Sequence, residues 1–92
     1  MVVTVVERVV AIVNPLGLHA RPAAEFVKVA GRFEAEIHVE KDGMAVNGKS
    51  IMGVMTLAAE CGSSLTIRTV GGDAEAAADA LVALVRRGFS EA

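Results

Sequence analysis

Residues 34–47 read Glu-Ala-Glu-Ile-His-Val-Glu-Lys-Asp-Gly-Met-Ala-Val-Asn, and this stretch decides the fold. Ala35, Ile37 and Val39 alternate with polar residues, which predicts a strand with one face in water. The Asp-Gly pair that follows is a strong hairpin signal, so residues 44–47 are expected to return as a short strand. A hairpin with one wet face indicates an antiparallel sheet that is covered on its other face.

The segments around this hairpin complete the predicted fold. Strands are expected at residues 5–13 and 65–68, and helices from about residue 19 to Gly31, from 51 to 60 and from 74 to 87. Asp73 is expected to cap the third helix with its side chain. The order βαββαβα predicts an α+β open-faced sandwich, in which three helices cover one face of a four-stranded antiparallel sheet. Residues 1–92 are expected to form one domain.

Apolar stripes on two helices supply part of the expected core. The first stripe consists of Ala23, Phe26, Val27 and Ala30, and the second of Ala77, Leu81, Leu84 and Val85.

Composition excludes several classes of function. Of 92 residues 53% are hydrophobic, only 3% are aromatic, and the net charge is −2, which argues against a nucleic-acid surface. Cys61 is the single cysteine, so a disulfide framework is excluded. The apolar run up to Val13 contains two charges and is too short to span a bilayer, and it lacks the pattern of a signal peptide. We therefore expect a cytoplasmic protein without membrane insertion.

The most unusual segment is Gly-Leu-His-Ala-Arg-Pro-Ala-Ala, residues 17–24. Pro22 is tolerated only in the first turn of a helix, so His19 is expected at or just before the helix start. The backbone amides of Ala20 and Arg21 would then form a positive, anion-binding end that also disfavours a charged imidazole. A neutral ring nitrogen can attack phosphorus, and the Arg21 guanidinium can hold phosphoryl oxygens. The simpler interpretation is that His19 is only the cap residue at the start of the helix and that Arg21 is a solvated surface charge.

Two segments together resemble a known family. Asn-Pro-Leu-Gly-Leu-His-Ala-Arg-Pro-Ala-Ala at residues 14–24 is similar to the active-site signature of HPr, the histidine-containing phosphocarrier of the bacterial sugar phosphotransferase system. Lys-Ser-Ile-Met-Gly-Val-Met at residues 49–55 is similar to its regulatory signature, and the order of elements also matches.

The resemblance implies a non-catalytic carrier. His19 would hold the phosphoryl group on Nδ1 with help from Arg21, enzyme I would be the donor, and sugar-specific IIA domains would be the acceptors. We expect a monomer that needs no cofactor and no metal. A similar branch serves a nitrogen-linked regulatory phosphorelay, and Pro22 after Arg21 favours the sugar branch.

Ser50 and the helix that it opens have two interpretations. Ser50 is suited to an N-cap, and the resemblance matches it with the regulatory serine that an HPr kinase/phosphorylase modifies. A helical wheel places Val54, Leu57 and Ala58 on one side, which suits the core. Ile51, Met52 and Met55 lie on another side, where they are either also core or a docking face for partners; the family's docking face falls on these three residues.

Three rival functions remain open from sequence. Residues 43–50 match the P-loop pattern of nucleotide-binding enzymes, although residues 44–46 are predicted to form a strand. A metal site of His19, His38 and Cys61 matches no zinc spacing, and Cys61 is expected to be buried. A passive protein-interaction module would use the methionine face and would need no reactive His19.

Overall fold

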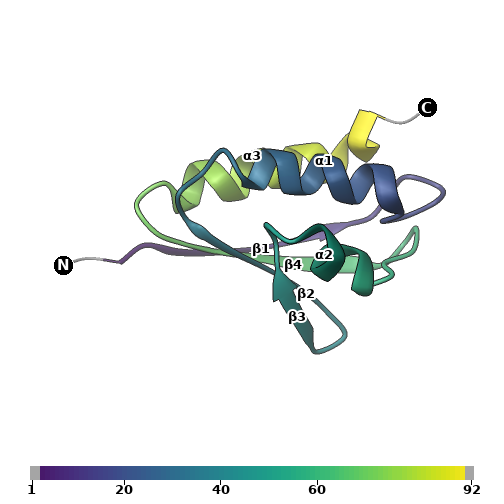
Figure 1. Cartoon of the computed structure of the whole chain (residues 1–92), viewed down its shortest axis with the longest axis horizontal. Helices are drawn as coiled ribbons and strands as arrows, with labels where there is room; N and C mark the ends of the chain where they lie inside the picture. Colours follow the sequence, from purple (N-terminus) through teal and green to yellow (C-terminus); the bar gives the residue numbers. More distant parts are fainter. Residues whose placement is uncertain (1–2, 91–92) are drawn as a thin grey trace.

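The computed structural model describes residues 3–90 and confirms the predicted fold class. Its four strands form one antiparallel sheet in the order β1-β4-β2-β3, and the helices lie on one face of it (Figure 1). The elements are β1 (Val5–Ala11), α1 (Ala20–Ala30), β2 (Glu36–Lys41), β3 (Met44–Asn47), α2 (Ile51–Thr56), β4 (Ser64–Val70), α3 (Ala74–Arg86) and a short 3-10 turn η1 (Gly88–Ser90).

The β2–β3 hairpin forms as the sequence predicts. Asp42 and Gly43 both have positive φ, 51° and 83°, as a two-residue turn between twisted strands requires. Strand β2 therefore lies between β3 and β4, with Val39 opposite Val46 on one side and opposite Ile67 on the other. This central position buries Ile37 and Val39 under the helices.

The core lies between the sheet and the helix layer and is built almost entirely from aliphatic side chains. Its largest fully buried members include Phe26, Ile37, Leu65, Ile67 and Leu81. All four residues of the predicted stripe on α3 are buried, which confirms it. On α1, Val27 is only partly buried and Val29 takes its expected place, because the helix also packs sideways against α2 and α3.

Several predicted boundaries are wrong. Strand β1 ends at Ala11 instead of residue 13, and α2 ends at Thr56 instead of residue 60. Ala58 adopts a left-handed conformation with φ 48°, which a helix cannot continue through, and it is exposed where the core was expected. Gly31 follows α1 with φ −66°, so the helix ends there without the left-handed glycine that usually closes a helix.

Asp73 stands at the predicted helix start but does not cap it. Its side chain makes no hydrogen bond to α3; instead the two carboxylate oxygens accept the amides of Glu34 at 2.9 Å and Ala35 at 2.8 Å. The Glu34 hydrogen bond above all, together with the Ala35 amide and the nearby Lys49 charge, holds the pKa of Asp73 below its usual range. Asp73 therefore connects the start of α3 to the segment that enters β2.

This contact predicts an acid-sensitive step in stability. Because the folded pKa is lowered, the carboxylate stabilises the fold above the ordinary aspartate pKa of about 4, and this contribution is lost as the pH falls through the lower, native pKa. Asp73→Asn should lower the free energy of unfolding at neutral pH and flatten its dependence on pH below about 4. Urea denaturation at several pH values measures both effects. Asp79→Asn, on the exposed side of α3, is the control that should change neither.

Candidate functional site

The connection between β1 and α1 is a tight loop that ends at His19. The buried Asn14 side chain donates from Nδ2 to the Gly17 carbonyl at 2.8 Å, and the His19 amide donates to the same oxygen at 3.0 Å. The Gly17 amide donates back to the Asn14 carbonyl at 3.1 Å. Asn14 thus fixes the loop that presents His19. Sequence reasoning treated Asn14 only as part of a break and a signature, although asparagine before proline is a known turn former.

Gly17 allows the loop to approach the segment that follows α2. Its φ is +68°, and a Cβ atom at this position would lie 2.3 Å from the Ala59 carbonyl oxygen. The next amide, that of Leu18, donates to this same oxygen at 2.8 Å, and the Leu18 side chain is buried. The backbone of residues 58–60 therefore supports the loop from behind.

His19 is the N-cap residue of α1, as the sequence predicts. Its backbone is extended, with φ −78° and ψ −174°, and its ring makes no capping hydrogen bond to the helix. The ring is partly exposed, and Ala20 and Arg21 beside it are exposed, whereas Pro22 is buried. The first amides of a helix have no acceptor within it, and the first turn of α1 holds no acidic side chain. This end of α1 can therefore attract an anion.

Helix α2, which Ser50 opens, packs against α1, and the segment that follows α2 contacts the loop before His19. The Ser50 hydroxyl accepts the Gly53 amide at 3.1 Å, which confirms the predicted N-cap. In the predicted core set Val54 and Leu57 are buried. The other set faces solvent, with Ile51, Met52 and Met55 exposed by 40%, 73% and 39%. The interpretation of all six residues as core is therefore wrong.

A further apolar residue near His19 was missed by sequence reasoning. Leu16 is 75% exposed, three residues before His19 in the loop that Asn14 fixes. The available signal was a leucine between Pro15 and Gly17, in a segment with no periodicity that could bury it. Figure 1 shows this loop, the start of α1, the end of α3 and the end of α2 at one end of the domain. An exposed apolar residue is thus present on the loop as well as on α2.

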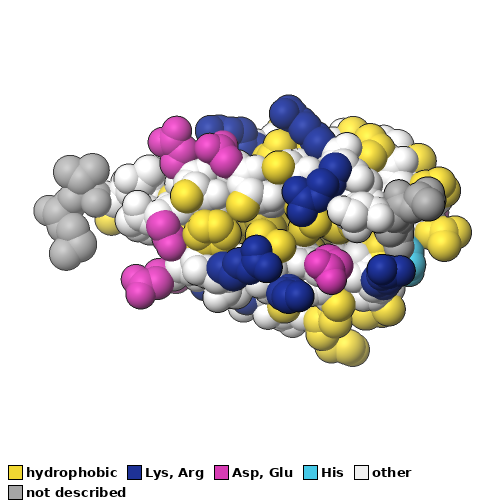
Figure 2. Space-filling view, turned by 90° about the horizontal axis from the view of Figure 1, so that it is seen from above, with side chains coloured by type: hydrophobic (Ala, Val, Ile, Leu, Met, Phe, Trp, Pro, Cys, Tyr) yellow, Lys and Arg dark blue, Asp and Glu magenta, His cyan; other side chains and the backbone are white. Residues whose placement is uncertain are grey.

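The helix layer has a basic character. Arg21, Lys28 and Arg32 on and after α1 are exposed, as are Arg86 and Arg87 at the end of α3. Figure 2 looks onto this layer and shows lysine and arginine side chains spread across it, with acidic side chains between some of them. The layer that contains His19 therefore suits an anionic group more than the sheet face does, where Glu7, Glu36 and Glu40 are exposed.

The structure does not support the P-loop alternative. Met44–Asn47 form β3 and pair with β2, so these residues cannot wrap around a phosphate. The Lys49 ammonium, which a P-loop would direct at phosphates, donates to the Phe33 carbonyl at 2.6 Å.

The candidate metal ligands are not brought together. His38 lies on β2 with Nε2 3.8 Å from Glu36 Oε2, whereas Cys61 is exposed and not buried as expected. Cys61 Sγ lies 3.7 Å from the Val13 carbonyl. Within residues 3–90 no group of three or more His, Cys, Asp or Glu side chains is placed to hold a metal.

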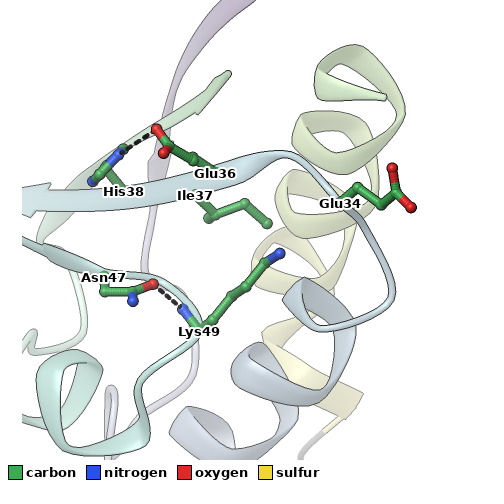
Figure 3. A pocket seen from close by; sticks show the side chains of 6 residues that line it. All are labelled: Glu34, Glu36, Ile37, His38, Asn47 and Lys49. Atoms are coloured by element: carbon green, nitrogen blue, oxygen red, sulfur yellow. Dashed lines mark hydrogen bonds and ion pairs between the residues drawn. The ribbon is translucent and has the colours of Figure 1, made fainter. Parts of the chain in front are cut away.

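A shallow pocket of about 220 Å³ opens between β2, β3 and the residue before Ser50 (Figure 3). It is lined by Glu34, Glu36, Ile37, His38, Asn47 and Lys49. Some of its polar side chains already interact with other groups of the chain: the His38 ring lies close to the Glu36 carboxylate, and the Lys49 ammonium donates to the Phe33 carbonyl. It does not include His19 and adds nothing to the site.

Fold and site together define a small open-faced sandwich domain that presents a partly exposed histidine at the start of its first helix. The family described as "PTS HPr component phosphorylation site" matches residues 6–87. The chain therefore belongs to the HPr family of phosphocarriers of the phosphotransferase system.

Individual relatives agree with this assignment. The chain is 50% identical to the HPr-like protein Crh of Halalkalibacterium halodurans over 89% of this chain and 98% of that protein. It is 46% identical to the phosphocarrier protein HPr of Cupriavidus necator over 92% of this chain and 96% of that protein. The crystal structure of HPr from Thermoanaerobacter tengcongensis superimposes with a TM-score of 0.91 at 46% identity and covers 95% of this chain and 98% of its own. Among the described residues no helix has the length and apolar character needed to cross a membrane.

Proposed function

We propose that this protein accepts a phosphoryl group on Nδ1 of His19 from enzyme I and passes it to IIA domains for sugar uptake. The observation that supports this most is the position of His19, partly exposed at the N-cap of α1 and beside exposed Arg21. The ring can be reached by a second protein, and the phosphoryl group would lie near helix amides and a guanidinium.

The proposed step is a displacement at phosphorus. The lone pair of Nδ1 forms a new bond to phosphorus while the bond between phosphorus and its donor atom breaks, and the donor keeps that electron pair. Phosphoryl transfer depends mainly on positioning and on stabilising the charge of the equatorial oxygens. The loop held by Asn14 and Ala59 provides the position, and Arg21 with the first amides of α1 provides positive charge. The chain does not turn over a substrate by itself and needs no cofactor.

Partner proteins would dock on the exposed apolar residues of α2, which are Ile51, Met52 and Met55. Because α2 packs against α1, a partner that covers them would lie close to the helix that His19 begins. Methionine side chains are flexible and fit several surfaces, which suits a carrier that meets a donor and an acceptor in turn. Leu16 extends this docking face on the loop side.

Ser50 is the proposed regulatory phosphosite, with an HPr kinase/phosphorylase as the enzyme. Phosphorylation would add a charge of about −2 next to Ile51 and Met52. The change would weaken docking of a partner with an acidic surface, while the buried Val54 and Leu57 keep α2 attached to the core. We propose that the protein works in the cytoplasm as a monomer and as one domain over residues 1–92.

Labelling with radioactive phosphoenolpyruvate and purified enzyme I tests the proposal directly. An acid-labile label on His19, which chases onto a sugar-specific IIA domain, is the expected result. A label that chases only onto a IIA protein of a nitrogen-linked relay would place the chain in that branch. Absence of label would instead support a passive interaction module.

Arg21→Ala should slow phosphoryl transfer without unfolding the protein. Arg21 is exposed, so its removal should cost less than about 0.5 kcal/mol in stability, while loss of one charged donor to phosphoryl oxygens should slow transfer by roughly 10–100-fold. Rapid-quench measurement of transfer from enzyme I gives the rate. Arg32→Ala, which removes an exposed arginine just beyond the other end of α1, is the control; equal rates for both variants would exclude a role for Arg21 at the phosphoryl group.

A further inference from the structure

The two edges of the sheet are unequal. The order β1-β4-β2-β3 leaves β1 and β3 as edge strands. Strand β3 has four residues, which is short enough to offer little surface for pairing, but β1 has seven. On β1, Val5 and Val9 point to the open face of the sheet and are exposed, and Val3 before the strand is exposed as well. A long apolar edge of this kind is a template for pairing with another chain.

Only two charged residues interrupt this segment. Glu7 and Arg8 are the sole charges between residues 1 and 13, and they stand in the middle of β1. They point to opposite faces: Glu7 Oε2 lies 4.0 Å from Arg68 Nε on the open face, and Arg8 lies 3.9 Å from Asp79 on the helix side. All four side chains are exposed, so these ion pairs contribute little to stability. The position of Glu7 and Arg8 on the edge strand is therefore better explained by an effect on pairing with another strand.

We propose that Glu7 and Arg8 keep the β1 edge from pairing with the β1 edge of a second copy of this chain. In a two-fold antiparallel pairing, opposed residues point to the same face of the joined sheet. The register that opposes all seven residues places Arg8 against Arg8 of the second copy. A shift of the pairing by two residues in one direction places Glu7 against Glu7 of the second copy. A shift by two residues in the other direction places Glu7 and Arg8 against apolar residues. Like charges that face each other directly destabilise a strand pair.

The inference does not depend on phosphoryl transfer, and self-association tests it. Glu7→Thr/Arg8→Thr removes both charges, leaves the net charge unchanged and keeps β-forming residues on the strand. The matched control is Glu40→Thr/Lys41→Thr, which removes an adjacent acid and base from β2, an inner strand. Sedimentation velocity from micromolar to millimolar concentration should show single chains for the natural protein and for the control. The β1 variant should reach the mass of two chains.

A third substitution tests whether the new contact is the edge itself. Adding Val9→Lys to the β1 variant restores a charge on the strand, and this should return the protein to single chains. Two results would overturn the proposal: a β1 variant that remains a single chain at the highest concentration, or a dimer that Val9→Lys does not dissociate. Should the double variant fail to fold, Arg8→Thr alone relieves the clash in the full-length register and is judged by the same criteria.

Discussion

His19→Ala should abolish acceptance of the phosphoryl group and leave the fold intact. The substitution removes the proposed nucleophile. The other histidine, His38, lies on β2, with its Nε2 3.8 Å from Glu36 of the same strand and opposite Arg68 of β4. The His19 side chain is partly exposed at the start of α1 and lies outside the core, so the free energy of unfolding should change by less than about 1 kcal/mol.

Labelling with phosphoenolpyruvate and enzyme I, together with urea denaturation, measures both parts of this prediction. His38→Ala is the matched control and should label fully. Label that persists on the His19→Ala variant would show that another residue accepts the phosphoryl group, and the proposed carrier mechanism would have to be abandoned.

Gly17→Ala should have the largest effect on stability among substitutions near the site. A left-handed conformation costs a residue with a Cβ about 1–2 kcal/mol, and here the added carbon would also lie 2.3 Å from the Ala59 carbonyl oxygen. The atoms that the added Cβ would meet belong to the backbone of Ala59 and Glu60, which cannot rotate away as a side chain can. The loop or the segment after α2 must therefore move. We expect a loss of roughly 2–4 kcal/mol in unfolding free energy.

The same movement should impair transfer, since the loop positions His19. A displacement of the nucleophile by a fraction of an ångström to 1 Å can slow transfer by about 10–100-fold. Gly43→Ala provides the control: its φ is also positive, at +83°, but no atom lies within 4 Å of the added Cβ. That variant should lose only about 1 kcal/mol and should transfer at the natural rate. Equal destabilisation of both variants would mean that the Ala59 contact is unimportant.

Local patterns in the sequence were sufficient for the fold class and for the place of His19. Alternation before Asp42-Gly43 and the turn itself determine the central hairpin, because both depend on residues within one strand or turn. Pro22 restricts the start of α1 in the same local way, and Ser50 caps α2 through an amide only three residues away. The roles of His19, Arg21 and Ser50 remain predictions that the labelling experiments test.

Features that join distant parts of the chain could not be read from those patterns. Asp73 looked like an ordinary helix cap, but its carboxylate binds amides 38 and 39 residues earlier in the chain. The early end of α2 goes with the left-handed turn at Ala58, and the next residue, Ala59, accepts a hydrogen bond from Leu18 in the loop before His19. The pattern also left open whether Ile51, Met52 and Met55 were core or surface.

The sequence by itself determined the order of elements, the open-faced sheet and a histidine at a helix start, because each follows from interactions within a few residues. Only the tertiary structure decided what holds the His19 loop in place and which apolar residues remain in solvent around it. Those outcomes depend on which backbone donors, acceptors and side chains meet after the sheet has closed, and residues such as Gly17 and Ala59 become neighbours only then.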